Sequence, residues 1–159
     1  MNISVVCIGK LKEKYWRDAV QEYSRRLSRY CRLSIIELPE SRLRANAGEA
    51  EEARVIREEG EEILGKIRPG QYVITLEIRG RKMTSEKLAE TISDLALTGE
   101  ADVVFVIGGS LGLSQDVSRR ADLKLSFSDM TFPHQMMRVI LLEQIYRSFK
   151  IIRNEPYHK

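Results

Sequence analysis

A glycine-rich turn directly after an apolar segment is the strongest chemical signal in the sequence. Gly108-Gly109-Ser110-Leu111-Gly112 follows Val103–Ile107, an apolar and mostly β-branched run. Glycines let a backbone turn sharply and let a ligand approach the main chain closely. The motif is neither the G-x-G-x-x-G dinucleotide fingerprint nor a Walker loop, because no Gly-Lys-Ser/Thr follows it. Its spacing alone leaves a ligand pocket and a purely structural turn equally open.

A second polar segment, Ser128–His134, separates the last predicted strand from the last predicted helix. Its backbone groups could contact a flat heterocycle at the end of that strand. The competing interpretation is a polar connection capped by Thr131 and Pro133. His134 has no acid or nucleophile at a spacing that would form a triad. We expect it to be a partly buried residue at the start of the helix.

The C-terminal residues combine basic and aromatic side chains. Arg153, Tyr157 and His158 could stack on a base and hold a phosphate group. A solvated tail is the alternative, and composition alone favours it, because chain ends are usually solvated. The aromatic residues Tyr15, Trp16 and Tyr23 have helical spacing, which favours the core over a stacking platform for bases.

Composition predicts an ordinary globular protein with a single domain over residues 1–159. Apolar residues make up 43% of the chain and charged residues 31%. No apolar run approaches the roughly 20 residues of a membrane helix, and we see no signal-peptide pattern, so we expect a cytoplasmic protein without a membrane partner. The two cysteines, Cys7 and Cys31, are too few and too far apart for a metal site, and no metal is predicted.

Charge is unevenly distributed along the chain. Residues 1–47 contain ten basic against five acidic residues, whereas residues 48–67 contain seven glutamates against three basic residues. The basic portions, including the loop Ser41–Ala47, could meet a polyanion, and we expect the acidic helix to face solvent or a basic partner. Solvated helix faces explain the charge pattern equally simply.

The elements that must position these residues alternate between strands and helices. The predicted strands are Asn2–Ile8, Leu33–Leu38, Tyr72–Glu77, Val103–Ile107 and Leu123–Phe127. The predicted helices are Tyr15–Tyr30, Gly48–Ile67, a helix capped by Ser85 and running to Leu97, a short one capped by Ser114 and running to Arg120, and Pro133–Phe149, while Ile78–Lys82 reads as a short connection. The order predicts an α/β fold with a parallel sheet covered on both faces. Ligands of such sheets collect at the carboxyl ends of strands, where the glycine turn and Ser128 lie.

Four segments together resemble one family of methyltransferases. They are VIGGSLG at 106–112, LSFSDMTFPHQMMR at 125–138, LEQIYR at 142–147 and PYHK at 156–159, and Ile8–Lys12 and the chain length agree. This composite pattern is similar to that of the RlmH (YbeA) family, the SPOUT-class methyltransferases of large-subunit ribosomal RNA. The resemblance covers essentially the whole chain.

The resemblance implies a fold, an activity and a set of cofactor contacts. Members are homodimers with a C-terminal trefoil knot, a feature that the usual rule against threaded chains would have excluded. They transfer the methyl group of S-adenosylmethionine to N3 of a pseudouridine in 23S ribosomal RNA, within the large subunit or the assembled ribosome. Carried over by motif, the cofactor positions are Leu76, Gly108, Phe127, Ser128, Asp129, Met130, Thr131 and Phe132.

The reaction also needs a group that takes the N3 proton. His158 is the candidate by residue type, with Tyr157 and Arg153 positioning the base and phosphate. Because so small a monomer has little surface for an RNA stem-loop, we expect the tail and Lys10–Lys14 of one chain to face the pocket of the other. The alternatives are a methyltransferase of another RNA such as transfer RNA, and a non-catalytic nucleotide- or RNA-binding module.

Overall fold

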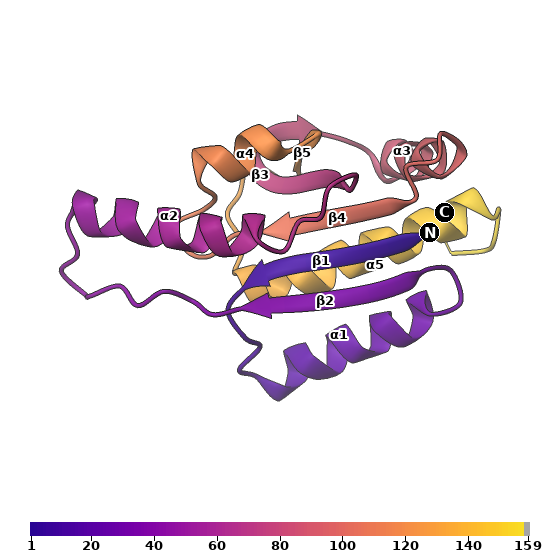
Figure 1. The fold of residues 1–159 in the computed structure, drawn as a ribbon. Coiled ribbons are helices and arrows are strands. Elements are labelled where there is room, and N and C mark those ends of the chain that lie inside the picture. The colour runs from indigo at the N-terminus through magenta and orange to yellow at the C-terminus, as the bar shows by residue number, and fades with distance from the viewer. Residues whose placement is uncertain (158–159) are drawn as a thin grey trace.

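The computed structural model describes residues 1–157, which form a five-stranded sheet between helices (Figure 1). The strands are β1 (Asn2–Ile8), β2 (Arg32–Leu38), β3 (Tyr72–Lys82), β4 (Asp102–Ile107) and β5 (Leu123–Ser126). The helices are α1 (Lys14–Leu27), α2 (Glu49–Leu64), α3 (Ser85–Leu97), α4 (Gln115–Arg120) and α5 (His134–Ile152). The strand order is β2-β1-β4-β3-β5 and every pairing is parallel. The predicted α/β class and parallel sheet are therefore confirmed.

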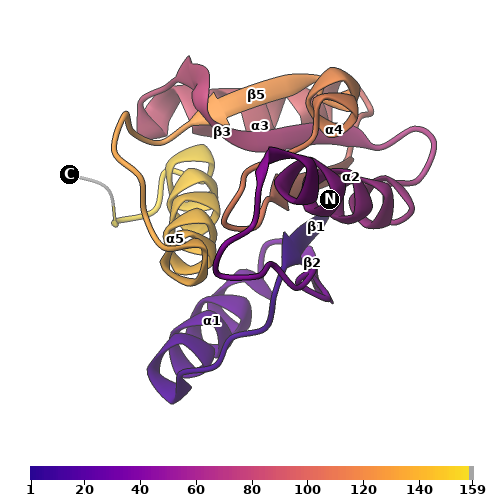
Figure 2. The ribbon, with the colours of Figure 1, turned by 90° about the vertical axis from the view of Figure 1, so that its left-hand side faces the viewer.

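Helices cover both faces of the sheet, with α1, α3 and α5 on one face and α2 and α4 on the other (Figures 1 and 2). The apolar run of β4 explains this arrangement. Val103, Phe105 and Ile107 belong to the core beneath α1, α3 and α5, whereas Val104 and Val106 belong to the core beneath α2 and α4. Because successive side chains of a strand point to opposite faces, a central strand needs apolar residues at every position.

Strands β1, β2 and β4 all point toward one edge of the sheet, the left edge in Figure 1 and the edge facing the viewer in Figure 2. Helix α5 begins at this carboxyl edge and runs back along the sheet between α1 and α3 to the opposite edge. The residues that begin α5 and those that end it therefore lie on opposite sides of the molecule.

The first helix differs from its prediction at both ends. It stops at Leu27, and the backbone N–H groups of Tyr30 and Cys31 both donate to the Leu27 carbonyl, at 2.8 and 3.0 Å. The expected core position of Tyr15 is wrong, since 63% of that residue is exposed, while Trp16 is half-buried. Helical spacing places residues on a common face but does not fix how far the neighbouring layer extends.

Two other helix ends are shifted by a residue or more. Thr84, not Ser85, caps α3: its hydroxyl accepts a hydrogen bond from the Lys87 N–H at 3.2 Å, while the Ser85 hydroxyl donates to Gln144 of α5 at 2.7 Å. Helix α5 starts after Pro133 and continues beyond the predicted end to Ile152. The Ser85 hydroxyl thus makes a tertiary contact with α5 and does not cap its own helix. The sequence alone does not reveal this contact.

The structure replaces the predicted connection after residue 77 with a continuation of β3. Leu125 of β5 pairs with both Leu76 and Arg81, so residues 77–80 stand outside the ladder between the two pairings. We call residues 77–80 the β3 excursion. A Cβ atom on Gly80 would lie 2.8 Å from backbone atoms of Lys124 and Leu125. The excursion therefore needs a glycine where its backbone closely approaches the backbone of β5.

Gly80→Ala is expected to destabilise the fold by about 1–3 kcal/mol, because the backbone of β5 cannot move aside as a flexible side chain could. Thermal unfolding should show a lower Tm, by about 2–4 °C for each kcal/mol in a chain of this size. Gly65→Ala is the matched control, since a Cβ there meets only carbonyl oxygens at 3.4 and 3.5 Å. Equal melting of the two variants would contradict the close approach.

Candidate functional site

The ends of three neighbouring strands bring the predicted cofactor residues together. Strand β3 lies between β4 and β5, and its Thr75 pairs with Val106 while Leu76 pairs with Leu125. Leu76 is therefore flanked on one side by the chain that leads into Gly108 and on the other by the chain that leads into Phe127. Adjacent strand ends of this kind form the usual ligand site of a parallel sheet.

The glycine turn is tightly closed on itself. The Gly112 N–H donates to the Gly109 carbonyl at 3.1 Å, and Gly112 has a φ of 82°, which favours glycine. A Cβ on Gly108 would lie 2.9 Å from the Leu113 side chain and 3.0 Å from the Gly112 carbonyl carbon. The predicted cap after the turn is confirmed, because the Ser114 hydroxyl accepts from the Val117 N–H at 3.3 Å.

Glu59 of α2 lies against the glycine turn at Gly109, a position that the sequence did not indicate. It is only 4% exposed, and its carboxylate accepts a hydrogen bond from the Ser41 N–H at 3.1 Å. A Cβ on Gly109 would lie 2.9 Å from its second carboxylate oxygen. Burial raises the pKa of Glu59, and the Ser41 hydrogen bond partly opposes the rise. The expectation that the acidic helix faces solvent is wrong at this residue.

Glu59→Gln should change how stability depends on pH. Since the folded state raises the pKa of Glu59, its charge costs stability, and wild-type stability falls as the pH rises above the ordinary value of 4.5. The variant lacks this titration, so its stability relative to wild type should increase from acid to neutral pH in urea unfolding. Glu61→Gln, an exposed change on the same helix, keeps Glu59 and should leave the wild-type pH dependence. Parallel curves for Glu59→Gln and wild type would contradict this account.

The segment after β5 is held at its start and leaves backbone donors exposed beyond. The Ser126 hydroxyl donates to the Ile78 carbonyl at 2.8 Å, and the Met130 N–H donates to the Ser128 hydroxyl at 3.0 Å. Within residues 1–157, the N–H groups of Asp129, Thr131 and Phe132 donate to no acceptor. Unpaired N–H groups at a strand end are suited to bind the edge of a ligand.

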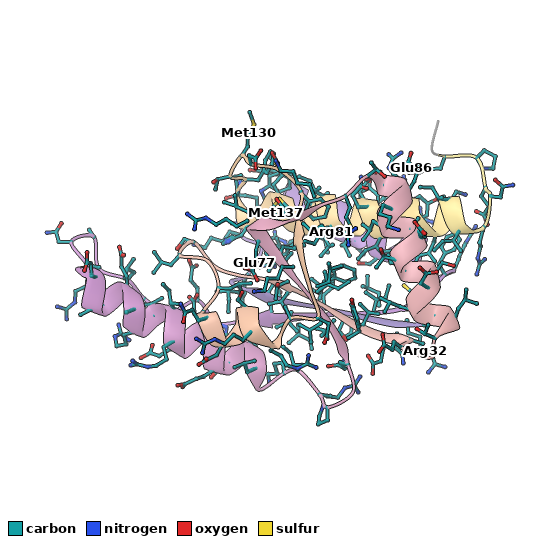
Figure 3. The ribbon with its side chains drawn as sticks, turned by 90° about the horizontal axis from the view of Figure 1, so that it is seen from above. Arg32, Glu77, Arg81, Glu86, Met130 and Met137 are labelled. Carbon is teal, nitrogen blue, oxygen red and sulfur yellow. The ribbon has the colours of Figure 1, made fainter. Side chains whose placement is uncertain are left out.

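The side chains around these donors are mostly apolar. Leu76 and Phe127 pack against the core that underlies α1, α3 and α5, and Phe132 is half-buried. Met130 is 72% exposed and projects from the molecule (Figure 3). Asp129 forms an ion pair with Lys82 of β3, which fixes the segment against that strand. Apolar surface beside backbone donors fits a flat heterocycle.

Two hollows of the described surface are lined by none of the predicted cofactor residues. One is lined by Ser24, Ser28, Cys31, Arg32, Leu33 and Ile35. The other is lined by Pro39, Glu40, Ser41, Glu58, Glu61, Glu62, Gly65 and Lys66. The candidate site is thus defined by converging strand ends.

Arg138 fastens the start of α5 to the same edge of the sheet. It is 1% exposed, donates to the carbonyls of Ile8 and Gly9 at 3.0 and 2.6 Å, and forms an ion pair with Glu37 at 2.6 Å. His134, one turn earlier, is half-buried as predicted, and burial followed by the Arg138 charge lowers its pKa. Sequence spacing placed Arg138 on the helix but gave no sign that a buried arginine joins three elements.

Arg153, one of the predicted catalytic residues, lies at the far end of α5. Arg153 follows the helix and stacks over the Tyr30 ring, with 4.6 Å from its guanidinium carbon to the ring centroid. The 19 residues of α5 span about 28 Å. The structure therefore does not bring Arg153 to the candidate cofactor residues of the same chain, and Tyr157 contacts Glu143, Tyr146 and Arg147 of α5. His158 lies outside the described residues.

Tyr157 is held against α5 by polar and aromatic contacts. Its hydroxyl donates to Glu143 at 3.2 Å, and the Arg147 guanidinium carbon lies 4.8 Å from its ring centroid. The Tyr146 ring packs edge-on at 5.0 Å. Burial, followed by the Glu143 charge, raises the pKa of Tyr157 to about 12. At neutral pH its phenol therefore stays protonated and acts as a hydrogen-bond donor.

Comparison with known proteins places the chain in a family. A family model described as "Predicted SPOUT methyltransferase" matches residues 1–158. The ribosomal RNA large subunit methyltransferase H 1 of Clostridium perfringens is 55% identical over the full length of both chains. The chain belongs to the RlmH family of SPOUT methyltransferases. The methyltransferase H of Clostridium novyi, 56% identical over both full lengths, is a further relative in the RlmH family.

A solved structure shares the fold at much lower identity. A probable methylase family protein from Haemophilus influenzae aligns with a TM-score of 0.54 and 14% identity, covering 99% of this chain and 70% of that one. At this identity the likeness concerns the fold alone. The five-stranded parallel sheet of this RlmH-family member is therefore an arrangement found in a distant methylase.

The described residues contain neither a metal-binding group nor a helix that could span a membrane. No group of three or more histidine, cysteine or acidic side chains in residues 1–157 could hold a metal ion. No helix in that range is long and apolar enough to cross a membrane.

Proposed function

We propose that this chain transfers the methyl group of S-adenosylmethionine to N3 of a pseudouridine in 23S ribosomal RNA, acting on the large subunit or the assembled ribosome. The observation that carries the proposal is full-length identity of 55% to a ribosomal RNA large subunit methyltransferase. The convergence of Leu76, Gly108 and Phe127–Phe132 at one sheet edge supports it independently.

The residues at that edge fit the methyl donor. Leu76 and Phe132 supply apolar contacts for the faces of adenine, and the unpaired N–H groups of residues 127–132 can bind its edge. A side chain at position 108 would collide with Leu113 and Gly112 of the turn, so Gly108 leaves the main chain there open to the donor. When bound, S-adenosylmethionine supplies a methyl group already activated by its sulfonium, so the protein contributes mainly position.

On the RNA side, the N3–methyl bond forms as the sulfur–methyl bond breaks, and the N3 proton leaves to a base or to water. We assign the base to His158, with Arg153 holding phosphate and Tyr157 placing the nucleotide. The raised pKa of Tyr157 supports this division, because a protonated phenol donates a hydrogen bond and does not accept the proton.

We infer that the working unit is a homodimer with a shared site. Within one chain Arg153 follows the far end of α5, a helix about 28 Å long, while Tyr157 packs against Glu143, Tyr146 and Arg147 of that helix. Two chains packed antiparallel around a twofold axis would place each tail, and Lys10–Lys14, beside the other chain's pocket. The position of Arg153 beyond the far end of α5 supports the partner arrangement.

The remaining features of the proposal follow from the family. We propose that residues 1–159 form a single domain whose C-terminal part is a trefoil knot. Residues 127–133 lead from the edge strand β5 to α5 in the middle of a helical layer, and a threaded crossing would lie there. Since ribosomes are the target, we place the reaction in the cytoplasm.

The test supplies isotopically labelled S-adenosylmethionine with ribosomes, separated subunits or transfer RNA, and identifies labelled nucleosides by mass spectrometry. The proposal predicts label on N3-methylpseudouridine from the large subunit or ribosome. Label in transfer RNA alone would reject the ribosomal target. Donor binding without label in any RNA would indicate the non-catalytic binding module.

A further inference from the structure

The segment that crosses β5 carries a concentrated positive charge. Residues 78–82 read Ile-Arg-Gly-Arg-Lys, and Arg79, Arg81 and Lys82 are all exposed. Lys124 of β5 is also exposed, and Gly80 packs against its backbone. We call Arg79, Arg81, Lys82 and Lys124 the basic arch. The pairing of Arg81 with Leu125 and of Lys82 with Ser126 places the backbone of these cations along the edge where β3 and β5 meet.

Most of this charge is not neutralised within residues 1–157. Lys82 pairs with Asp129, but Arg79, Arg81 and Lys124 have no acidic partner in residues 1–157. The adjacent acid, Glu77, accepts hydrogen bonds from Thr75 and Ser118 instead.

Some arginines elsewhere in residues 1–157 have acidic partners, whereas others, such as Arg32 and Arg57, have none. Arg26 pairs with Glu22, Arg54 with Glu58 and Arg138 with Glu37. Unpaired cations held close together repel one another, and an anionic ligand relieves the repulsion. The arch is therefore a surface suited to a polyanion.

The arch also lies beside the candidate donor pocket. Leu76 directly precedes the β3 excursion, and the Lys82–Asp129 ion pair ties the arch to the segment after β5. Figure 3 labels Glu77 and Arg81 of this region, Met130 in the neighbouring segment, and Arg32 at the opposite edge of the sheet. A nucleotide that reaches the methyl donor must bring its flanking phosphates near these strand ends.

We propose that the basic arch binds phosphate groups of the substrate RNA next to the target nucleotide, an inference that rests on the proposed function. The close approach at Gly80 and the ladder contacts hold the backbone of the arch against β5, so the cations are attached to an ordered strand edge before RNA binds. Phosphate contacts of this kind set the orientation of the RNA and carry no sequence information. A membrane surface fits less well, because Ile78 is the only large apolar side chain of residues 78–82.

The test replaces two cations and measures the salt dependence of RNA binding. R79Q/R81Q is compared with wild type by fluorescence anisotropy, using a labelled RNA stem-loop over a series of KCl concentrations. We expect roughly tenfold weaker binding at low salt and a plot of log affinity against log salt that is shallower by about 1.4 to 1.8, since each lost phosphate contact removes 0.7 to 0.9. Affinity for S-adenosylmethionine should stay unchanged.

R32Q/R57Q is the matched control, because it removes the same charge from exposed positions away from the arch. An equal loss of RNA affinity in the control, or an unchanged salt slope in R79Q/R81Q, would overturn the proposal that the arch binds RNA phosphates. Methylation of ribosomes is measured separately on the wild type. Failure of wild-type methylation together with a slope change specific to R79Q/R81Q rejects the proposed substrate and keeps the arch as a polyanion site.

Discussion

Gly108→Val is expected to weaken binding of S-adenosylmethionine by 100-fold or more, about 3 kcal/mol. Even a Cβ at this position would lie 2.9 Å from Leu113 and 3.0 Å from Gly112. The branched side chain must therefore displace the turn or occupy the space proposed for the donor. Either outcome removes the main-chain surface that the donor would approach. Isothermal titration calorimetry measures the loss directly, and methyl transfer to ribosomes should fall in parallel.

Gly48→Val is the control for this change. Gly48 precedes α2 with a φ of −86°, and no atom lies within 4 Å of a Cβ there. Donor affinity in this variant should stay within about twofold of wild type, with at most a small loss of helix stability from the altered cap. If Gly108→Val bound the donor normally, the glycine turn would be a structural turn and no part of the pocket.

Two inactive variants should restore activity when they are mixed. Gly108→Val removes the donor pocket, and R153A/Y157A removes the tail groups assigned to the RNA. If the tail acts on its partner's pocket, a mixed dimer contains one intact site made of the wild-type pocket of one chain and the wild-type tail of the other. Random exchange makes half of the dimers mixed, so about a quarter of wild-type turnover should return.

The alternative arrangement gives a different result in the same experiment. If the tail served the pocket of its own chain, every site in a mixed dimer would carry one defect and no activity would return. Each variant alone must be inactive and folded, which near-ultraviolet circular dichroism and thermal unfolding establish. A stable and active wild-type monomer in gel filtration with light scattering would also contradict the shared site.

The sequence predicted the elements well where short-range patterns decide them. The alternation of strands and helices, the buried run of β4 and the Ser114 cap all follow from periodicity and capping chemistry, and the structure confirms them. The position of the segment Ser128–His134 after the last strand also followed from element order. These features depend on neighbours within a few residues.

Features that depend on contacts between distant residues were missed. The excursion of β3 needs Gly80 to approach the backbone of a strand more than forty residues away. The residues next to Gly80 in the sequence do not predict this contact. Glu59 and Arg138 look like ordinary helix charges, yet both are buried because they bind main-chain groups of other elements. Likewise, the distance between the tail and the pocket became visible only once α5 was placed along the sheet.

Hydrogen–deuterium exchange with and without S-adenosylmethionine tests the central claim most directly. The N–H groups of Asp129, Thr131 and Phe132 have no acceptor within residues 1–157 and should exchange quickly in the free protein. If three strand ends form the donor pocket, binding will slow exchange in residues 127–132, in the turn around Gly108 and beside Leu76. Protection confined to other regions, such as the hollow that includes Cys31 and Arg32, would contradict it.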